Sequence, residues 1–514
     1  MRHNASTGRR ASAITLTRRE SKANLAYSMK KMLLSALLIS TFASLALGAE
    51  EVAGIPSLSR FALENGLEVY AYRDTAVPLA RVQVAFKAGA ISQGPESAGL
   101  FHLYEHMLFR GSAAHPGSAG VKAALAALGV SEWNGGTGAE RVDYWITLPS
   151  AEMARGLAFW AETLVSPSFD AQALEAEKEV VVQEIRGRAS DPDAIYEAAI
   201  AKRLFAKYPW RRDPAGSEKA VREATVASLK ALASTWFVPG NAAVFVGGDI
   251  DPEEVRSAAT AAFGAWTVGP DPWKKGLPRN PRPGVARPTW IVYPDQSMPE
   301  GIGRIEARYR GPDLAYDVAS SYAADLWSSL VSPAEGRFKT ALEAGVPKLG
   351  GKDSIVASYI SQRDGGWISI SSYFIADPAL PAVDRARQFK ERERAFEITS
   401  MKADASYFSA AEYEAARRRL LDYRDMATDT AEGMIETLAF WWAAASVDYY
   451  AGFPAVLART GAKEVSAFLD AFIMRNLEVV ALRMNPADIE REKRSLAGSG
   501  FETVSASNAF WWQK

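Results

Sequence analysis

A proline-rich segment near the middle of the chain constrains its fold more than any other feature. Residues 268–290, VGPDPWKKGLPRNPRPGVARPTW, contain six prolines. Proline lacks the backbone N–H that a helix interior or a central strand needs, so we predict a semi-rigid linker here. The linker separates residues 50–267 from residues 291–514. We expect these parts to be two domains, because 514 residues are too many for one ordinary core.

The two parts share a faint sequence echo. FVPGNAAVFVGGDIDPEE, which starts at Phe237, resembles FIMRNLEVVALRMNPADI, which starts at Phe472, at an offset of 235 residues. In both segments a Phe precedes an Asn by four positions, a strand pattern follows, and a Pro then opens an acidic helix start. The echo therefore predicts duplicated halves.

Local patterns predict several elements of the first half. Asn65 and Gly66 mark a tight turn, and alternating apolar residues after it and in residues 80–89 indicate strands of a half-buried antiparallel sheet. Helical periodicity replaces the alternation near Ser97. Further predicted elements are a strand in AERVDYWITLP, helices over 151–164 and 171–188, and a helix with Asp251 as N-cap and Pro252 at its first position.

Composition excludes several classes of protein. Hydrophobic residues make up 48% and charged residues 23% of the chain, as in a soluble globular protein. The net charge of -1 provides no basic surface for a nucleic acid, so we expect no such partner. Because the chain contains no cysteine, disulfides and thiolate metal sites are excluded. Any metal would be held by His and carboxylate side chains.

The first 49 residues have the pattern of a leader. Residues 1–31 carry eight Lys or Arg and one acid, and residues 32–47 are uncharged and mostly apolar. This order predicts a secretory signal peptide, best shaped if translation starts at Met29. We therefore expect a periplasmic or secreted protein without stable membrane insertion once the leader is removed. An uncleaved leader that anchors the chain to a membrane is the alternative.

Two of the four histidines lie in GLFHLYEHMLFRGS, residues 99–112. On a helix, His102, Glu105 and His106 share one face, because positions i, i+3 and i+4 project together. Two imidazoles four apart can both reach one zinc ion, and the carboxylate can take a proton from water beside it. A third ligand would come from elsewhere, and a carboxylate is the natural choice. The alternatives are a chance cluster and histidines that only pack.

GLFHLYEHMLFRGS resembles the signature of the insulinase/pitrilysin family of zinc metallopeptidases, in its bacterial two-repeat type. The resemblance implies one Zn²⁺ per chain and a third ligand within an acidic helical stretch downstream. Here that stretch is EKEVVVQEI, where Glu184 follows His106 by 78 positions. The resemblance assigns Glu184 as the metal ligand, Glu105 as the catalytic base, and Glu177 as the residue that orients a ligand from behind.

The resemblance also implies the fold. It predicts an α+β protein of two homologous, α/β-sandwich-like halves, each a mostly antiparallel sheet flanked by helices. The proline-rich linker would join a zinc-binding catalytic domain, residues 50–267, to a domain without a metal site, residues 291–514. In the family the two halves close like a clam shell around short or unfolded peptides.

A second match lies in NGGTGAERVDYWITLP, which resembles the family's edge-strand segment. In the family this edge binds the substrate backbone by strand addition. The match assigns Asn134, Thr137 and Tyr144 to substrate binding, although Gly135 and Gly136 replace the bulkier residues usual there. The alternative is an ordinary hairpin strand.

The resemblance fails in the second half. Active members use an Arg and a Tyr seven apart to hold the substrate and stabilise the oxyanion. Arg337 matches the preceding turn, but the two required positions fall on or near Glu343 and Gly350. Loss of an oxyanion donor costs about 10²–10³ in rate, so we expect a homologous partner subunit, without the metal motif, to supply the pair. Action of this chain alone is the alternative.

These observations together predict a secreted zinc endopeptidase that cleaves peptides or unfolded polypeptides, as the metal-bearing subunit of a heterodimer. The alternative is a non-catalytic assembly or binding subunit with the same fold. His115 is expected to be a loop residue. Two tryptophan pairs, Trp441–Trp442 and Trp511–Trp512, are expected to pack in a core or to face a partner.

Overall fold

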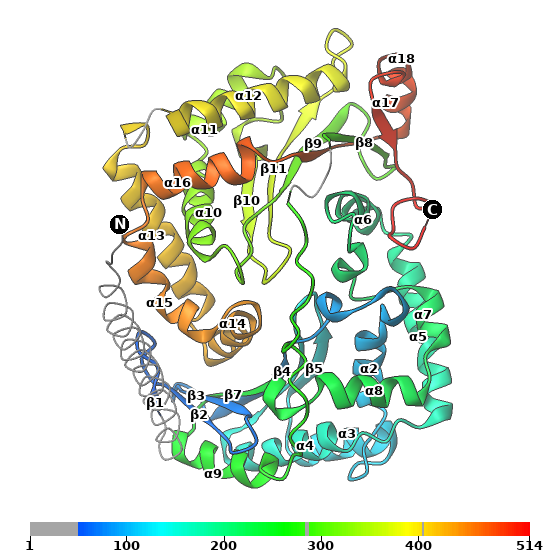
Figure 1. The fold of residues 1–514 in the computed structure, drawn as a ribbon, viewed down its shortest axis with the longest axis vertical. Coiled ribbons are helices and arrows are strands. Elements are labelled where there is room, and N and C mark those ends of the chain that lie inside the picture. Colours follow the sequence, from blue (N-terminus) through cyan, green and yellow to red (C-terminus); the bar gives the residue numbers. More distant parts are fainter. Residues whose placement is uncertain (1–49, 283–286, 403–405, 514) are drawn as a thin grey trace, which may run out of the picture. The chain divides into compact units, whose positions relative to one another are not determined.

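The structure is a computed structural model that describes residues 50–282, 287–402 and 406–513 (Figure 1). The predicted leader, residues 1–49, lies outside these residues, and so do residues 283–286 of the predicted linker. Among the residues that are described, no helix combines the length and the apolar character that crossing a membrane requires.

The first half contains a sheet of seven strands in the order β1-β2-β3-β7-β4-β6-β5. Neighbouring strands from β2 onward are antiparallel, except that β3 and β7 are parallel. Strand β5 lies at one edge of the sheet. The strands are β1 (Glu50–Glu51), β2 (Leu58–Ala62), β3 (Glu68–Arg73), β4 (Leu79–Phe86), β5 (Glu132–Thr137), β6 (Val142–Pro149) and β7 (Ala242–Gly248).

Helices α5 to α9 of the first half begin where the sequence supplies a capping side chain. Asp170 accepts a hydrogen bond from the N–H of Ala173 at the start of α5, and Asp251 caps α9 ahead of Pro252, as predicted. The helices are α2 (Leu100–Leu108), α3 (Gly117–Ala127), α4 (Met153–Val165), α5 (Ala171–Arg188), α6 (Pro192–Leu204), α7 (Glu218–Glu223), α8 (Val226–Trp236) and α9 (Pro252–Phe263).

The second half contains a sheet of six strands in the order β10-β11-β9-β12-β8-β13. Its strands are β8 (Thr289–Pro294), β9 (Ile302–Arg310), β10 (Val356–Ile360), β11 (Trp367–Ile375), β12 (Glu478–Met484) and β13 (Phe501–Thr503). Its helices are α10 (Val318–Val331), α11 (Arg337–Gly345), α12 (Ala382–Lys402), α13 (Ala410–Ala427), α14 (Ala431–Ala444), α15 (Val447–Leu457), α16 (Ala462–Leu469), α17 (Pro486–Arg491) and α18 (Lys493–Leu496).

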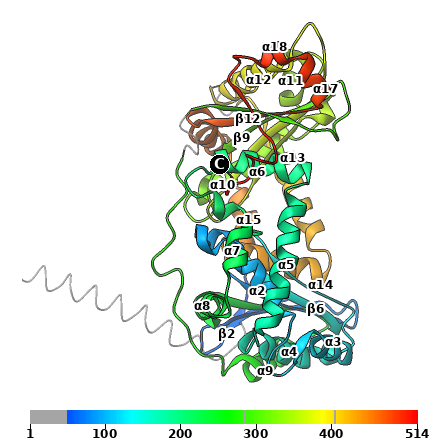
Figure 2. The same ribbon diagram turned by 90° about the vertical axis from the view of Figure 1, so that its right-hand side faces the viewer.

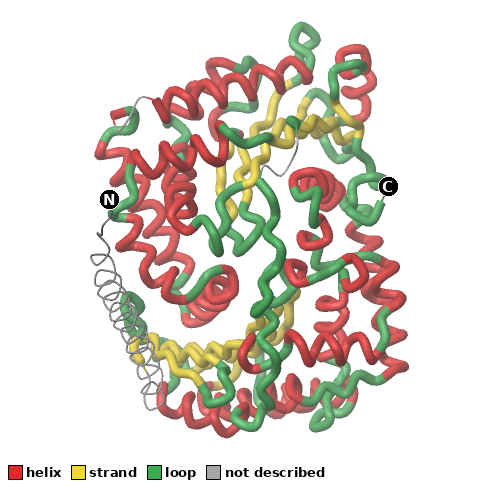
Figure 3. Tube along the Cα trace, viewed as in Figure 1, coloured by secondary structure: helices red, strands yellow, loops and turns green. Residues whose placement is uncertain are grey.

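The two sheets repeat one strand order. Strands β3-β7-β4-β6-β5 of the first sheet correspond in chain order and direction to β8-β12-β9-β11-β10 of the second. In each set the first and last strands along the chain are parallel neighbours, and the other pairs are antiparallel. Figure 3 shows the two groups of strands in yellow, with helices around each. The predicted α+β fold of two homologous, mostly antiparallel halves is confirmed.

The sequence echo has a structural cause. Asn241 precedes the last strand of the first half, and its amide donates to the carbonyl oxygens of Trp236, at 2.8 Å, and Lys87, at 3.3 Å. Asn476, 235 residues later, donates to the carbonyl oxygens of Phe472, at 3.1 Å, and Arg310, at 2.7 Å. Both amides are buried. Each ties the start of one strand, β7 or β12, to the end of its neighbour, β4 or β9.

Each half lends one helix to the other half's sheet. Helix α14 packs on β3, β4 and β7, where Ile435 and Leu438 join Phe245 in one buried cluster. Helix α6 packs on β9 and β12, where Ile200 joins Val479 in another. Figures 1 and 2 both show α6 beside β9. The first sheet was expected to be half-buried, which is wrong for β4, because α14 covers its second face and only Leu79 of that strand is exposed.

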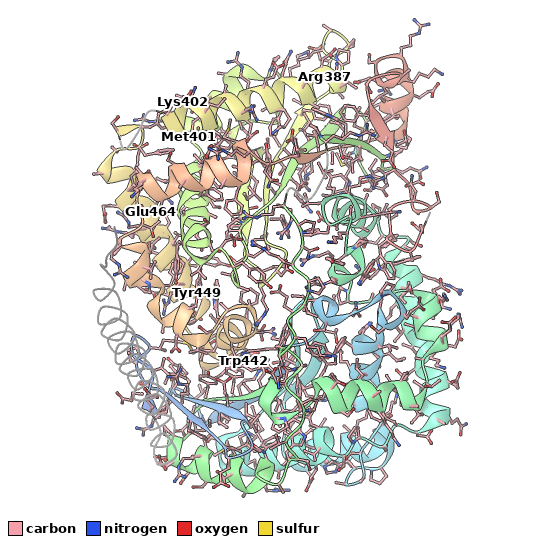
Figure 4. The ribbon with its side chains drawn as sticks, in the orientation of Figure 1. Arg387, Met401, Lys402, Trp442, Tyr449 and Glu464 are labelled. Carbon is pink, nitrogen blue, oxygen red and sulfur yellow. The ribbon has the colours of Figure 1, made fainter. Side chains whose placement is uncertain are left out.

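One tryptophan of each predicted pair forms a hydrogen bond from the second half to the first. Trp442, labelled in Figure 4, is buried in the cluster of α14 with the first sheet, and its indole N–H donates to Glu68 at 3.0 Å. The indole N–H of Trp511 donates to Asp213 at 3.2 Å. Core packing, one of the two predicted roles, is therefore confirmed for Trp442.

The proline-rich segment forms no helix or strand over its described residues between α9 and β8. Contacts with both halves hold it in place. The indole N–H of Trp273 donates to Asn241 at 2.8 Å, and the backbone N–H of Asn280 donates to the carboxylate of Asp364 at 3.1 Å. Proline rigidity and these contacts agree with a stiff connection, while the domain limits drawn around it stay a prediction.

Candidate metal centre and substrate-binding edge

Helix α2 presents the predicted motif on its accessible face. Gly99 precedes the helix at a φ of 99°, where a side chain would meet the carbonyl oxygen of Ala215, so glycine is needed at this start. The opposite face packs in the core through Leu100, Phe101, Leu103, Tyr104, Met107 and Leu108. Because those apolar positions fix the rotation of the helix, His102, Glu105 and His106 are left together on the partly exposed side.

Helix α5 brings Glu184 to the two histidines. The Nε2 atoms of His102 and His106 lie 3.2 Å apart, and the Oε2 atom of Glu184 lies 3.4 Å from the first and 3.6 Å from the second. Tetrahedral zinc with bonds of about 2.0–2.1 Å places its ligand atoms about 3.3–3.4 Å apart. The three donor atoms therefore form a triangle of the size that one zinc ion requires.

The partners of the imidazoles favour the same use. Nδ1 of His106 lies 3.0 Å from the buried carboxylate of Glu177, which also forms an ion pair with Arg110. A proton on Nδ1 that is donated to Glu177 leaves a lone pair on Nε2, on the side of Glu184. Glu177 is thus placed where a residue that orients a ligand would have to be.

His102 is held in its neutral form. Burial, together with the charges of His106 and Arg188, lowers the pKa of its imidazole to about 4. Its Nδ1 atom is buried, and no hydrogen-bond partner for it exists among the described residues. A neutral imidazole has the free lone pair that a metal ligand needs, so the ring is competent for binding without losing a proton.

Glu105 sits beside the triangle with a hydrogen bond of its own. The hydroxyl of Thr137, on strand β5, donates to its Oε2 atom at 2.7 Å. Burial, reinforced by the charge of Glu184, raises the pKa of the Glu105 carboxyl, although the bond from Thr137 and the neighbouring His106 act in the opposite direction. A carboxylate with raised proton affinity is suited to accept and return a proton.

Strand β5 has one open edge. It pairs with β6 alone in the sheet, and its first three residues, including Asn134, are exposed. Thr137 lies at its end, next to Glu105. Tyr144 lies one strand inward on β6, with its side chain fully buried against Phe109 and Trp160, and so lies beneath the edge and away from its open side.

The unusual Gly135 of this edge has a steric reason. A side chain at that position would meet the rings of Tyr144 and Phe109 at about 3 Å. Glycine therefore lets the edge strand lie flat on these two rings. The structure thus joins Gly135 and Tyr144 into one packing unit, a relation that the sequence comparison alone did not suggest.

The turn after β5 is held by the second half of the chain. The buried carboxylate of Glu140 accepts the backbone N–H groups of Arg363, at 2.7 Å, and Asp364, at 3.1 Å. Within the first half, the N–H groups of Ala90 and Ile91 donate to the carbonyl oxygens of residues 138 and 139. These bonds fix the turn that follows Thr137. Nothing in the sequence signalled Glu140, because its partners lie more than 200 positions away.

A cavity of about 640 Å³ opens beside this edge. Gly136 and Thr137 line it from β5, and Glu432, Glu436 and Phe440 line it from α14. Room for a bound chain segment therefore exists next to the residue that contacts Glu105.

The remaining predicted positions lie apart from the triangle. Nε2 of His115 lies 3.0 Å from Glu162, and this residue precedes α3 in a loop, as expected. Glu343 is on α11, and Gly350 is an exposed residue whose N–H donates to the carbonyl of Tyr373 at 2.8 Å. Neither can serve as the Arg or Tyr of the active family members.

Comparison with known families agrees with this site. The family described as insulinase, peptidase family M16, matches residues 69–216, and the family described as the peptidase M16 inactive domain matches residues 223–420. Together they cover more than half of the chain, including the metal triangle. The chain therefore belongs to the insulinase/pitrilysin family of zinc metallopeptidases.

Curated relatives carry matching names. An uncharacterized zinc protease of Mycobacterium tuberculosis is 28% identical over 229 residues, which are 44% of this chain and 50% of the relative. Zinc protease PqqE of Helicobacter pylori is 26% identical over 242 residues, 46% of this chain and 53% of the relative. Coenzyme PQQ synthesis protein F of Pseudomonas aeruginosa is 28% identical over 203 residues, which are 39% of this chain and 26% of the relative. The chain spans about half or less of these relatives.

Solved structures share the fold. A protease from Helicobacter pylori superposes with a TM-score of 0.69 at 16% identity, covering 84% of this chain and all of the other. The first half of the periplasmic protease PqqL from Escherichia coli superposes with a TM-score of 0.68 at 17% identity. The superposition covers 88% of this chain and 97% of the other. At these identities the likeness establishes the architecture.

Proposed function

We propose that this protein is a zinc-dependent endopeptidase that hydrolyses peptides or unfolded polypeptides. The observation that carries the proposal is the triangle of His102, His106 and Glu184, which has the size of a zinc site and lies beside the carboxylate of Glu105. Membership of the insulinase/pitrilysin family and relatives named zinc proteases support it.

Each residue of the site has a defined task in this proposal. His102, His106 and Glu184 hold one zinc ion, and Glu177 orients His106. Bound zinc would supply a Lewis acid that polarises the scissile carbonyl and lowers the pKa of a water molecule. Glu105 takes a proton from that water and returns it to the leaving amine, a role worth about 10²–10⁴ in rate.

The open edge of β5 would bind the substrate. An extended peptide that pairs with the free N–H and C=O groups of this strand becomes an additional strand of the sheet, held through its main chain. Asn134 and Thr137 lie on the strand itself, whereas Tyr144 would act from beneath it by supporting Gly135. Thr137 also holds Glu105, so strand pairing and the position of the base are linked.

The cellular setting and the partner are further parts of the proposal. The leader pattern of residues 1–49 and the likeness to a periplasmic protease favour a periplasmic or secreted protein. Because the Arg and Tyr positions of the active family members fall on or near Glu343 and Gly350, a homologous subunit without the metal motif would complete the site as a heterodimer.

The absence of the Arg and Tyr from this chain favours a second candidate function. If no partner supplies the Arg and Tyr, a chain that lacks them would serve as a non-catalytic assembly or binding subunit. The intact set of metal-binding side chains speaks for the peptidase, because a non-catalytic subunit has no need of three donor atoms at the spacing of a zinc site.

Cleavage of an unfolded polypeptide, measured with bound zinc, separates the two candidates. The zinc-loaded chain, alone and mixed with a homologue that carries the Arg and Tyr, should cleave a quenched fluorescent peptide under at least one condition. Glu105→Gln should retain one zinc and lose about 10²–10⁴ in rate. Glu175→Gln, on an exposed position of α5, is the matched control and should cleave normally. Equal cleavage by Glu105→Gln and the wild type would remove Glu105 from the mechanism.

A further inference from the structure

A second cavity, of about 440 Å³, lies in the C-terminal half. We call it the Asp325 pocket. Five of its twelve lining residues are aromatic, and three are charged. The residues that matter for its chemistry are Asp325 of α10, Tyr423 of α13, Phe440 and Trp441 of α14, and Tyr450 and Phe453 of α15.

The Asp325 pocket is built on the helices that correspond to those of the metal centre. Helix α10 follows β9 as α2 follows β4, and α13 packs on α10 as α5 packs on α2. Helices α5 and α13 both have 18 residues, so Glu184, the fourteenth of α5, corresponds to Tyr423, the fourteenth of α13. Tyr423, which lines the pocket, therefore has the helix position that Glu184 has in the metal centre.

Asp325 is the unusual group of the pocket. No hydrogen bond or ion pair to its carboxyl exists among the described residues, and its neighbours include the rings of Tyr322, Tyr359 and Tyr449. Burial raises the pKa of this carboxyl to about 8. An unpaired carboxyl group in an aromatic pocket is destabilising unless a partner reaches it.

The other charged groups of the pocket already have partners. The guanidinium of Arg424 lies 3.9 Å from the ring centre of Tyr450 and donates to that residue's carbonyl oxygen at 2.8 Å. Glu436 accepts hydrogen bonds from Gln83, at 3.2 Å, and from Arg141. Among the described charged groups that line the pocket, Asp325 alone is free to meet a ligand.

We propose that the Asp325 pocket binds a basic side chain, of lysine or arginine, on the peptide substrate. The carboxyl group of Asp325 would release its proton to the solvent and pair with the cationic head, and the exposed rings of Tyr423 and Phe440 would attract the same charge. The aliphatic stem of the side chain would pack on the apolar walls. This inference takes the nature of the ligand from the proposed peptidase function.

The Asp325 pocket shares two lining residues with the cavity beside the substrate-binding edge. Glu436 and Phe440 line both the Asp325 pocket and the cavity beside Gly136 and Thr137. In this proposal a peptide paired with β5 passes these two residues and places a side chain against Asp325. The pocket would then select substrates by a basic residue at a distance from the scissile bond.

Binding, measured without cleavage, tests the proposal. The probes are two acetylated and amidated twelve-residue peptides of Ala, Ser and Thr, one with a central lysine and the other with norleucine in its place. Titration calorimetry uses the full-length, zinc-loaded chain with Glu105→Gln. We expect the lysine peptide to bind about 10-fold or more tightly, as for a charge-assisted hydrogen bond. Asp325→Asn, added to that background, should abolish the difference.

Two controls keep the result specific. Asp422→Asn removes one negative charge from an exposed position of the same helix as Tyr423 and should leave the preference intact. If Asp325→Asn does not fold, Phe440→Ala removes one aromatic wall at a residue that is 41% exposed and should weaken the preference for lysine.

Three results would overturn the proposal: equal binding of both peptides, tighter binding of the norleucine peptide, and a lysine preference that survives Asp325→Asn. Because cleavage is not measured, a negative result leaves the peptidase proposal untouched. A wild-type chain that cleaves nothing would leave a positive binding result equally intact.

Discussion

The two halves of this protein have the same frame and different chemistry. Their five core strands follow one order, and α5 and α13 have equal lengths, with capping side chains from Asp170 and Ser409. Along these helices Glu177 corresponds to Ala416 and Glu184 to Tyr423, and α10 contains no histidine where α2 has two. The shared fold depends on the pattern of apolar residues and on helix caps. The metal centre depends on four side chains that only the first half carries: His102, His106, Glu177 and Glu184.

The halves are also interlocked, because each covers one face of the other's sheet. Helix α6 follows α5, and α14 follows α13, and both cross to the opposite sheet. A duplicated unit of this kind cannot bury its own sheet fully. The half without metal-binding side chains therefore contributes to the first half through α14 and through the loop that holds Glu140.

Removing apolar volume from α14 should have the largest effect on stability. Leu438 is fully buried between α14 and the first sheet, so Leu438→Ala should lower the free energy of unfolding by about 2–5 kcal/mol. Phe440→Ala, on an exposed position of the same helix, should cost far less. Urea unfolding followed by far-UV circular dichroism checks both. Equal losses would mean that α14 does not stabilise the first half by this packing.

The matched asparagines offer a direct comparison of the halves. Asn241→Ala and Asn476→Ala each remove two buried hydrogen bonds from equivalent positions, so each should cost about 1–3 kcal/mol, and the two costs should be similar. Chemical unfolding of both variants measures this. A loss confined to one variant would show that the repeated bond has lost its structural role in the other half.

The support of His106 should matter for metal affinity. Glu177→Gln weakens the acceptor of the Nδ1 proton, and changes of this kind reduce metal affinity by about 10–100-fold. Glu175→Gln, on an exposed position of the same helix, should leave affinity unchanged. Competition with a fluorescent zinc chelator provides the measurement. Unchanged affinity in Glu177→Gln would show that the contact with His106 does not support binding.

The smallest expected effect concerns Asp325 and pH. Its pKa is about 8 in the folded protein and about 3.9 in an unfolded chain. Between these two pH values the carboxyl is ionised in the unfolded state and protonated in the folded state. The free energy of unfolding therefore falls as pH rises, and it stops falling above about pH 8. Asp325→Asn should therefore match the wild type near pH 4 and exceed it by on the order of 1 kcal/mol at pH 8. Thermal unfolding at both values checks this, and a constant difference would contradict the raised pKa.

Much of the frame and of the metal centre could be predicted from the sequence. The spacing of His102, Glu105 and His106 fixes a shared face on any helix, and the prediction of a helix over 171–188 matches α5. The echo between Phe237 and Phe472 had a cause in the paired asparagines. These features are local, so short stretches of sequence carry them.

The missing parts depend on contacts between distant segments. The full burial of β4 needs α14, which lies more than 340 positions later, and the bonds to Glu140 come from residues 363 and 364. The contact of Thr137 with Glu105 requires β5 to lie beside α2. No periodicity or composition encodes such a contact, because it arises only when the two segments have folded against each other.

We expect that only the first half of this protein builds a zinc site. Anomalous diffraction at the zinc absorption edge, from crystals grown with zinc, tests it most directly. We expect a single strong peak bounded by Nε2 of His102, Nε2 of His106 and the carboxylate of Glu184, with no peak beside Tyr423. A peak at another place, or no peak between the two imidazoles in crystals grown with excess zinc, would contradict the proposed zinc site.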